Sequence, residues 1–332
     1  MGEPIDVVVV GGYLGAGKTT LVNHLLRQGT GRRTLVLVND FGAIAVDDEL
    51  VESREGDVLT LANGCICCGL SSPLIDMLLQ VRDEGLGGRP ELVVIETSGV
   101  ADPEVVARHA MIPGFRRDAV VVVVDAETAR RREADPIVGR SIVRQLRAAD
   151  LVVLNKVDLV DAATLAAVRT LVGRHAPGAR VVETSRARLP AALVTGAAAA
   201  AEAASAGERA RDGGRGPASG SGTTAGPPVA AEAPHDGTDH DTWSWRGGVL
   251  DRAGLLAFLE ALPSGAVRAK GVLALSDAPD CSTLLQVVGR RHELVAGRAW
   301  GDARPASRLV VIGLRGSLDP TALDASISTA TR

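Results

Sequence analysis

Near its amino end the chain reads GYLGAGKT over residues 12–19, which fits the phosphate-loop pattern G-x-x-x-x-G-K-[ST]. The valine-rich run at 5–10 before it predicts a buried strand, and the stretch 18–28 predicts an amphipathic helix. Glycines let backbone N–H groups curl around phosphate oxygens, and a helix N-terminus attracts the same negative charge. The segment therefore predicts a nucleotide-phosphate site; the alternative is an incidental glycine-rich turn.

The positions of this loop have separate expected roles. The Lys18 ammonium is expected to contact the β- and γ-phosphates, and the Thr19 hydroxyl to ligate Mg²⁺. The remaining positions supply backbone around the phosphates. The predicted phosphate-binding residues are Gly12, Gly15, Ala16, Gly17, Lys18, Thr19 and Thr20.

A second motif, NKVD at 155–158, follows a buried strand expected at 151–155. A carboxylate at Asp158 can accept hydrogen bonds from guanine N1–H and the exocyclic amine, a donor pair that adenine lacks. Asn155 and Lys156 are expected to support the base and its loop. In a chain with a phosphate loop, this motif predicts GTP as the nucleotide. Residues 184–187 are a weaker candidate for the other wall of the base pocket.

A third buried strand, predicted at 92–96, ends in an acid and is followed by Thr-Ser-Gly. Glu96 is expected to hold Mg²⁺ through water, and the Gly99 N–H to sense the γ-phosphate. The alternative for Glu96 is a carboxylate that only caps the following turn. The two nucleotide motifs favour the catalytic interpretation, because such a site requires an acid.

Three of the four cysteines lie together in NGCICCG, residues 63–69. Adjacent cysteines do not readily bridge each other, and C-x-C-C is too tight for a four-ligand zinc site. Cys65, Cys67 and Cys68 could supply two or three thiolates, which select Zn²⁺ or similar late metals over Mg²⁺, and leave a position open for exchange. Buried inert thiols are the alternative, which a glycine-flanked loop disfavours.

Valine-rich runs alternate with helical stretches over the first two hundred residues. This alternation predicts an α/β, three-layer P-loop NTPase domain with a mostly parallel sheet. Residues 206–241 contain eight glycines and four prolines, which predicts a flexible linker. The expected organisation is a nucleotide-binding domain at 1–205, the linker at 206–241, and a small α+β C-terminal domain at 242–332.

The expected elements can be given by their ranges. In the first domain the strands are expected at 5–10, 34–39, 58–61, 92–96, 119–125, 151–155 and 180–183. The helices there are expected at 18–28, 71–84, 103–110, 136–148 and 161–174. In the second domain the helices are expected at 251–261 and 319–328, and the strands at 243–246, 271–275, 284–288, 292–296 and 308–313.

The overall charge excludes some classes of partner. The formal net charge is −4 and the pI is near 5.9, which argues against a basic nucleic-acid footprint. The sequence has no run of eighteen apolar residues, so no membrane-spanning helix is predicted. The acidic N-terminus does not have the pattern of a signal peptide. The sequence thus predicts a cytoplasmic protein with reduced thiols, no nucleic-acid partner and no membrane partner.

Taken together, these motifs resemble the CobW-like GTPases, GTP-dependent metallochaperones within the G3E group of P-loop GTPases. Their order and spacing match over almost the whole chain. The motifs that carry the resemblance are GGYLGAGKTT at 11–20, NDFG at 39–42, GCICCG at 64–69, ETSG at 96–99 and NKVD at 155–158. The tail from 243 to about 322 resembles the family's C-terminal domain through LEALP at 259–263, RAKG at 268–271 and LLQVVG at 284–289.

The resemblance implies hydrolysis of GTP to GDP and phosphate, coupled to delivery of Zn²⁺ or Co²⁺ to a client metalloprotein. It also implies that the three clustered cysteines are the metal motif and that Asp40 takes the acidic place of the family's N-E-F-G. Val38 and Ala43 stand where many members carry further acids, so fewer oxygen ligands are expected. Only His235 and His240 stand where many members carry a histidine-rich tract, which argues against metal storage.

These expectations combine into a switch. GTP and Mg²⁺ would order the loops around Asp40 and Glu96, and hydrolysis would change the thiolate geometry between them. The expected catalytic residues are Lys18, Thr19, Glu96 and Asp40, with Asp40, Asp47 and Asp48 as candidates to position the attacking water.

Other functions stay open at this stage. They are a GTPase whose cysteines sense redox state, a non-enzymatic GTP-binding scaffold and an ATP-dependent kinase, which NKVD disfavours. The client, the metal in the cell and a homo-oligomer are also left open.

Overall fold

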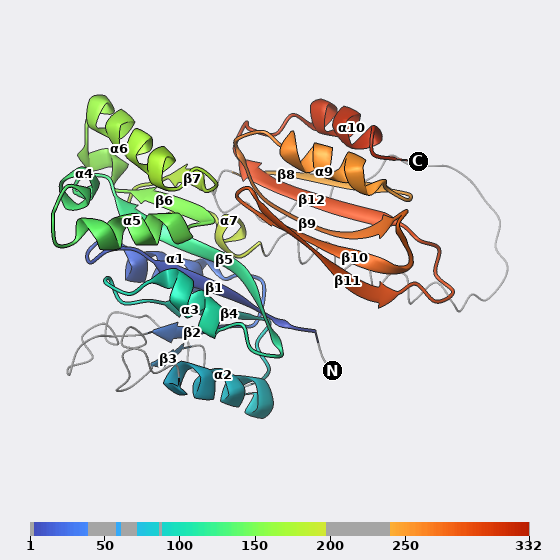
Figure 1. Cartoon of the computed structure of the whole chain (residues 1–332), viewed down its shortest axis with the longest axis horizontal. Helices are drawn as coiled ribbons and strands as arrows, with labels where there is room; N and C mark the ends of the chain where they lie inside the picture. Colours follow the sequence, from blue (N-terminus) through green and yellow to red (C-terminus); the bar gives the residue numbers. More distant parts are fainter. Residues whose placement is uncertain (1–2, 39–57, 61–71, 86–87, 197–239, 332) are drawn as a thin grey trace, which may run out of the picture.

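Two sheets, one parallel and one antiparallel, organise the residues that the computed structural model describes: 3–38, 58–60, 72–85, 88–196 and 240–331 (Figure 1). The first sheet has seven strands in the order β3-β2-β4-β1-β5-β6-β7, and every neighbouring pair is parallel. Its strands are β1 (Ile5–Gly11), β2 (Thr34–Val38), β3 (Val58–Thr60), β4 (Leu92–Glu96), β5 (Phe115–Asp125), β6 (Leu151–Asn155) and β7 (Arg180–Glu183).

Helices cover both faces of this sheet, as the valine-rich runs predict. Val7 and Val9 of β1 pack into one apolar cluster, whereas Val8 and Val10 pack into another, because successive side chains point to opposite faces. The first cluster takes side chains from α2 (Ser72–Glu84), α3 (Pro103–His109), α4 (Ala129–Glu133), α5 (Gly139–Ala148) and α6 (Ala162–His175). The second takes them from α1 (Lys18–Gln28) and α7 (Ala191–Thr195).

The second sheet is antiparallel and has the order β11-β10-β9-β12-β8. Trp243 and Phe258 contact each other in the cluster that joins the sheet to its two helices, with ring centroids 5.9 Å apart. The elements are β8 (His240–Gly247), α9 (Arg252–Glu260), β9 (Ala266–Leu275), β10 (Ala278–Val288), β11 (Arg291–Ala299), β12 (Ser307–Leu314) and α10 (Pro320–Ser328).

The two sheets meet through a contact that contains buried charges. Val267, Val288 and Val310 of the second sheet belong to the same apolar cluster as α1 and α7. Beside them, Arg268 Nη1 donates to both carboxylate oxygens of Asp118 at 2.9 Å, and both side chains are fully buried. Figure 1 shows this contact on the side of the parallel sheet away from the β1–α1 loop.

A second buried carboxylate in this contact is surrounded by three basic side chains. Lys270 of β9 lies 3.1 Å from Asp6 of β1, and Arg32 and Arg116 lie 2.8 and 2.6 Å from the same carboxylate. Burial alone would raise the pKa of Asp6, but the charges of Lys270, Arg116 and Arg32 hold it well below its ordinary value. The contact therefore combines apolar packing with paired charges.

The predicted α/β class and the small α+β C-terminal domain are confirmed. All five strands of the second sheet are longer than the apolar runs suggested: β9 begins at Ala266, β10 at Ala278, β11 spans Arg291–Ala299, and β8 and β12 extend beyond both predicted ends. Arg268 and Lys270 interrupt the apolar pattern of β9, yet both are buried against the first sheet. The short helix α7 was not predicted.

The predicted linker lies almost wholly outside the described residues. Its last two residues, His240 and Asp241, belong to β8 and pair with Leu314 and Gly313 of β12. Within the described part of the chain, no helix is long and apolar enough to cross a membrane.

Candidate functional site

The loop between β1 and α1 requires glycine at several positions. Gly12, Gly15 and Gly17 have φ values of 136°, 72° and 107°, a region that favours glycine. A Cβ on Gly12 would lie 2.3 Å from the backbone oxygen of Val123, and one on Gly17 would lie 2.5 Å from Nδ2 of Asn155. The loop therefore has the curled backbone that phosphate binding needs, and α1 begins directly at Lys18.

Lys18 and Thr19 lie at the first turn of α1, next to the end of β4. Lys18 is 8% exposed, and its Nζ donates to the carbonyl oxygen of Tyr13 at 3.4 Å. Thr19 Oγ1 donates to Oε1 of Glu96 at 2.6 Å, and Glu96 is 4% exposed. A hydroxyl and a carboxylate are the hard oxygen ligands that Mg²⁺ prefers, so the two residues fit the role predicted for them.

Asn155 forms hydrogen bonds with both the phosphate loop and the segment after β7. Its Nδ2 donates to the carbonyl oxygen of Ala16 at 2.9 Å, and its Oδ1 accepts from the Ala187 N–H at 2.8 Å. Asp158 is exposed in the short 3₁₀ helix η3 (Val157–Leu159), as a base-reading carboxylate must be. Asn155 thus contacts the predicted phosphate loop directly, although β5 lies between β6 and β1 in the sheet.

Asp125, at the end of β5, is a functional candidate that sequence reasoning missed. Its Oδ2 lies 2.9 Å from Nζ of Lys156, and its Oδ1 accepts from the Glu127 N–H at 2.9 Å. Burial raises the pKa of this carboxyl, but the hydrogen bond and charge of Lys156 hold it below its ordinary value. The strand register, which pairs Asp125 with Asn155, is the signal that could have found it.

The ion pair between Asp125 and Lys156 restrains Lys156 in an unfavourable backbone conformation. Lys156 has a φ of 63°, which side chains other than glycine rarely adopt. It directly follows Asn155 and precedes the loop that carries Asp158. Asp125 therefore restrains the predicted base-binding segment at its second residue, Lys156.

Replacing Asp125 with asparagine is expected to weaken selection of GTP over ATP. Loss of a hydrogen bond to a charged group costs about 1.5 kcal/mol, or roughly tenfold in kcat/KM for GTP. Because the pKa of Asp125 lies below its ordinary value, the loss should be constant between pH 6 and 8. Kinetics with GTP and ATP measure the ratio, and Glu127→Gln, an exposed neighbour, is the control. An unchanged ratio would contradict this role.

The turn after β4 contacts the phosphate loop directly. Gly99 is buried, and a Cβ there would lie 2.6 Å from the backbone nitrogen and side chain of Leu14. Arg132 of α4 supports the same part of the loop, because its Nη1 donates to Leu14 O at 2.7 Å and its guanidinium lies 4.8 Å from the Tyr13 ring centroid. Nothing in the pattern around Arg132 predicted this contact.

The predicted metal motif lies outside the described residues, between β3 and α2. The same holds for the three aspartates considered as candidates to position the attacking water. In the ranges that the structure covers, no group of three or more His, Cys, Asp or Glu residues could hold a metal ion. The fourth cysteine, Cys281, is partly buried in β10. The predicted site residues outside the described ranges are Asp40, Asp47, Asp48, Cys65, Cys67 and Cys68.

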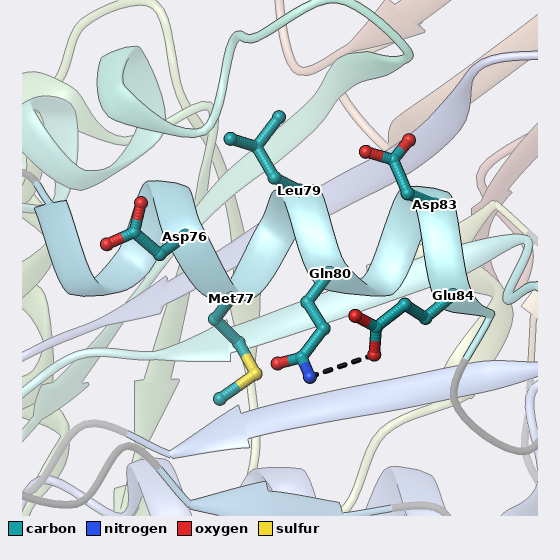
Figure 2. A pocket seen from close by; sticks show the side chains of 6 residues that line it. All are labelled: Asp76, Met77, Leu79, Gln80, Asp83 and Glu84. Carbon is teal, nitrogen blue, oxygen red and sulfur yellow. Dashed lines mark hydrogen bonds between the residues drawn. The ribbon is translucent and has the colours of Figure 1, made fainter.

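A shallow hollow of about 470 Å³ runs along α2, the helix that follows the cysteine motif in the chain. Figure 2 shows that the side chains around it all come from this helix, and that Gln80 donates to Glu84, at 2.9 Å. These six residues give it acidic and apolar character but no convergent set of ligands, so it is not assigned to the site. The lining residues are Asp76, Met77, Leu79, Gln80, Asp83 and Glu84.

Known proteins resemble this chain over nearly its full length. Residues 6–183 match the family model described as CobW/HypB/UreG, nucleotide-binding domain, and residues 241–331 match the cobalamin synthesis protein cobW C-terminal domain. A "Zinc chaperone CobW" of Sinorhizobium sp is 31% identical over 98% of this chain and 96% of its own length. A protein of the same name from Pseudomonas aeruginosa is 33% identical, over 98% and 91%. The solved structure of the Zn(II)-bound YjiA GTPase from E. coli covers 100% of both chains, with 22% identity and a TM-score of 0.45.

Proposed function

The chain belongs to the CobW/HypB/UreG nucleotide-binding family, and we propose that it is a GTP-hydrolysing metallochaperone that delivers zinc to a client protein. The observation that carries the GTPase part is the 2.6 Å hydrogen bond between Thr19 and Glu96, directly beside the phosphate loop. The zinc part is supported by the C-x-C-C motif and by the zinc chaperones that match 98% of the chain.

The phosphate loop binds GTP through its backbone and Lys18. The Lys18 ammonium, which donates to Tyr13 O inside the loop, transfers to the β- and γ-phosphate oxygens when nucleotide enters. Thr19 and Glu96 are the residues that would hold Mg²⁺, which neutralises charge on the phosphates when bound. Glu96, buried at 4% exposure, keeps its carboxylate close to Thr19.

The base is selected at the ends of β6 and β7. Asp158 is exposed and accepts from guanine, while Asn155 fixes the loops on either side through Ala16 and Ala187. Lys156 is held by Asp125 from the end of β5. Because adenine lacks the N1–H and the exocyclic amine that Asp158 would bind, ATP is a poor substrate.

The transition metal is the ion that the protein binds and delivers, not a resident cofactor. Cys65, Cys67 and Cys68 supply two or three thiolates, which favour Zn²⁺, with Co²⁺ as the second candidate. In the chain this motif lies between the end of β2, followed by Asp40, and the end of β4, where Glu96 stands. Hydrolysis of GTP by water to GDP and phosphate removes the γ-phosphate from these loops, which releases the metal to a client metalloprotein.

Anaerobic zinc titration with and without GTP tests this function. The reduced protein is expected to bind one Zn²⁺, with an affinity that differs between its GTP and GDP forms. The Cys67→Ala/Cys68→Ala variant is expected to lose at least about a hundredfold in affinity, because structural zinc sites depend on their thiolates for most of about 10 kcal/mol.

The remaining cysteine provides the matched control. Cys281 lies in β10 of the second sheet, so Cys281→Ser is expected to bind zinc like the natural chain. Full zinc affinity in the double variant would exclude the metal role of the motif. A loss of GTP turnover on mild oxidation, with no zinc bound when reduced, would favour the redox-sensing alternative.

A further inference from the structure

A buried amide on α5 holds the turn that follows β4. Gln145 is 2% exposed, and its Nε2 donates to the carbonyl oxygens of Gly99 at 3.0 Å and Ala101 at 2.9 Å. The turn is closed by the Ala101 N–H, which donates to Ser98 O at 3.1 Å. One side-chain nitrogen with two donors thus satisfies two carbonyls of the same turn.

The phosphate loop fixes the other side of this turn. Gly99 packs so closely on Leu14 that a Cβ would lie 2.6 Å from its backbone nitrogen. The Thr97 N–H donates to Val10 O at 2.9 Å, which joins the start of the turn to the end of β1. The turn therefore lies between the loop that surrounds the phosphates and the amide of Gln145.

We propose, on the basis of the function proposed above, that Gln145 is a positioning residue for the γ-phosphate of GTP. It acts through Gly99, whose N–H is the donor expected at the γ-phosphate. By holding the Gly99 and Ala101 carbonyls, Gln145 fixes the peptide groups that follow these two residues before nucleotide binds. The peptide group that contains the Gly99 N–H also contains the Ser98 carbonyl, which accepts from the Ala101 N–H, so Gln145 orients this N–H through the closed turn. A donor that is already oriented stabilises developing charge without reorganisation during the reaction.

The proposed role of Gln145 affects the affinity for GTP but not the affinity for GDP. GDP has no γ-phosphate, so its affinity depends on the phosphate loop and the base segment and not on the Gly99 turn. Without the amide, the turn can rotate its carbonyls toward water, and its N–H no longer points to a fixed place. GTP affinity and the hydrolysis rate then fall, whereas GDP affinity does not.

Gln145→Met is the direct test, because methionine keeps the length and volume of the side chain but removes both donors. Affinity for a non-hydrolysable GTP analogue and kcat for phosphate release are each expected to fall about tenfold, a fraction of the loss seen when a donor itself is removed. Affinity for GDP is expected to change less than about twofold, since no contact to it is lost. Fluorescent nucleotide titration and phosphate release measure these quantities.

Arg144 offers a matched control on the same helix. Its Nε lies 3.3 Å from Asp102, in the segment that Gln145 also contacts, but its side chain is 57% exposed. Arg144→Ala is therefore expected to leave both affinities and kcat unchanged. A second variant, Gln145→Asn, keeps the amide but shortens the side chain. Its affinity for the GTP analogue and its kcat should lie between those of the natural chain and those of Gln145→Met, and it introduces no thioether into the packing.

The outcomes are distinguishable. Equal losses of GTP-analogue and GDP affinity in both Gln145 variants would show that the amide only supports the fold, and would overturn the proposal. If Gln145→Met had the same ratio of GTP-analogue affinity to GDP affinity as the natural chain, the proposal would be overturned as well. Absence of phosphate release from the natural chain would instead contradict the proposed GTPase function.

Discussion

Replacing Lys18 with alanine is expected to lower the rate of GTP hydrolysis by at least about a hundredfold, the effect of removing a preorganised charge from a reaction centre. Lys18 is 8% exposed, and its ammonium donates to a carbonyl of the phosphate loop itself. Without it, the negative charge that spreads over the β- and γ-phosphates loses the cation placed nearest to it by the loop. Phosphate release at saturating GTP measures the effect.

Two comparisons separate this loss from unfolding. Lys18→Met keeps the aliphatic part of the side chain and should be as inactive as Lys18→Ala, because the charge is what matters. Arg27, exposed on the last turn of α1, gives a control variant, Arg27→Ala, that should hydrolyse GTP normally. Turnover retained in both Lys18 variants, with GTP still bound, would favour the non-enzymatic scaffold or a different phosphate site.

The sequence predicted best those positions that depend on local backbone geometry. The phosphate loop was predictable because Gly12 and Gly17 adopt backbone conformations that favour glycine, and because the motif fixes their spacing in the sequence from Lys18. Parallel topology then places Glu96 next to Thr19, since β4 lies beside β1 and both strands end at the same edge. The family resemblance drawn from these motifs is confirmed over both domains.

Residues that act across the tertiary structure could not be predicted in this way. Gln145 lies on an amphipathic helix, where one polar residue is as readily explained by solvent, yet it is buried against the turn at Gly99. Arg132 follows two other arginines in α4, and only the folded chain shows which one meets the phosphate loop. The partner of each group comes from a distant part of the chain, so no spacing in the sequence encodes it.

The contact between the two sheets is the clearest case. Arg268 and Lys270 interrupt the apolar pattern of β9 and lie before the strand predicted at 271–275. They are buried beside Asp118 and Asp6 of the first sheet. A charge is buried only with a partner, and the partners lie about 150 and 264 residues away in the chain.

Substituting Arg268 with methionine is expected to lower the free energy of unfolding by about 3–5 kcal/mol, the cost of leaving a buried partner unpaired. Asp118 would lose the guanidinium that donates to both of its oxygens at 2.9 Å, and Leu193 O would lose its donor at 2.8 Å. Lys270, 3.6 Å from Asp118, is too far for a full replacement. Chemical denaturation followed by far-UV circular dichroism measures the change.

Two further variants show whether the loss arises from an unpaired charge. Arg268→Met/Asp118→Leu removes both charges and should recover most of the stability, because a buried pair replaced by apolar side chains is often neutral. Arg298→Ala removes an ion pair between β11 and Glu3, which precedes β1, at 2.9 Å, but those side chains are 72% and 82% exposed. It should therefore cost less than about 1 kcal/mol. A double variant no more stable than Arg268→Met would instead mean that the lost packing of the arginine, and not the unpaired carboxylate, carries the destabilisation.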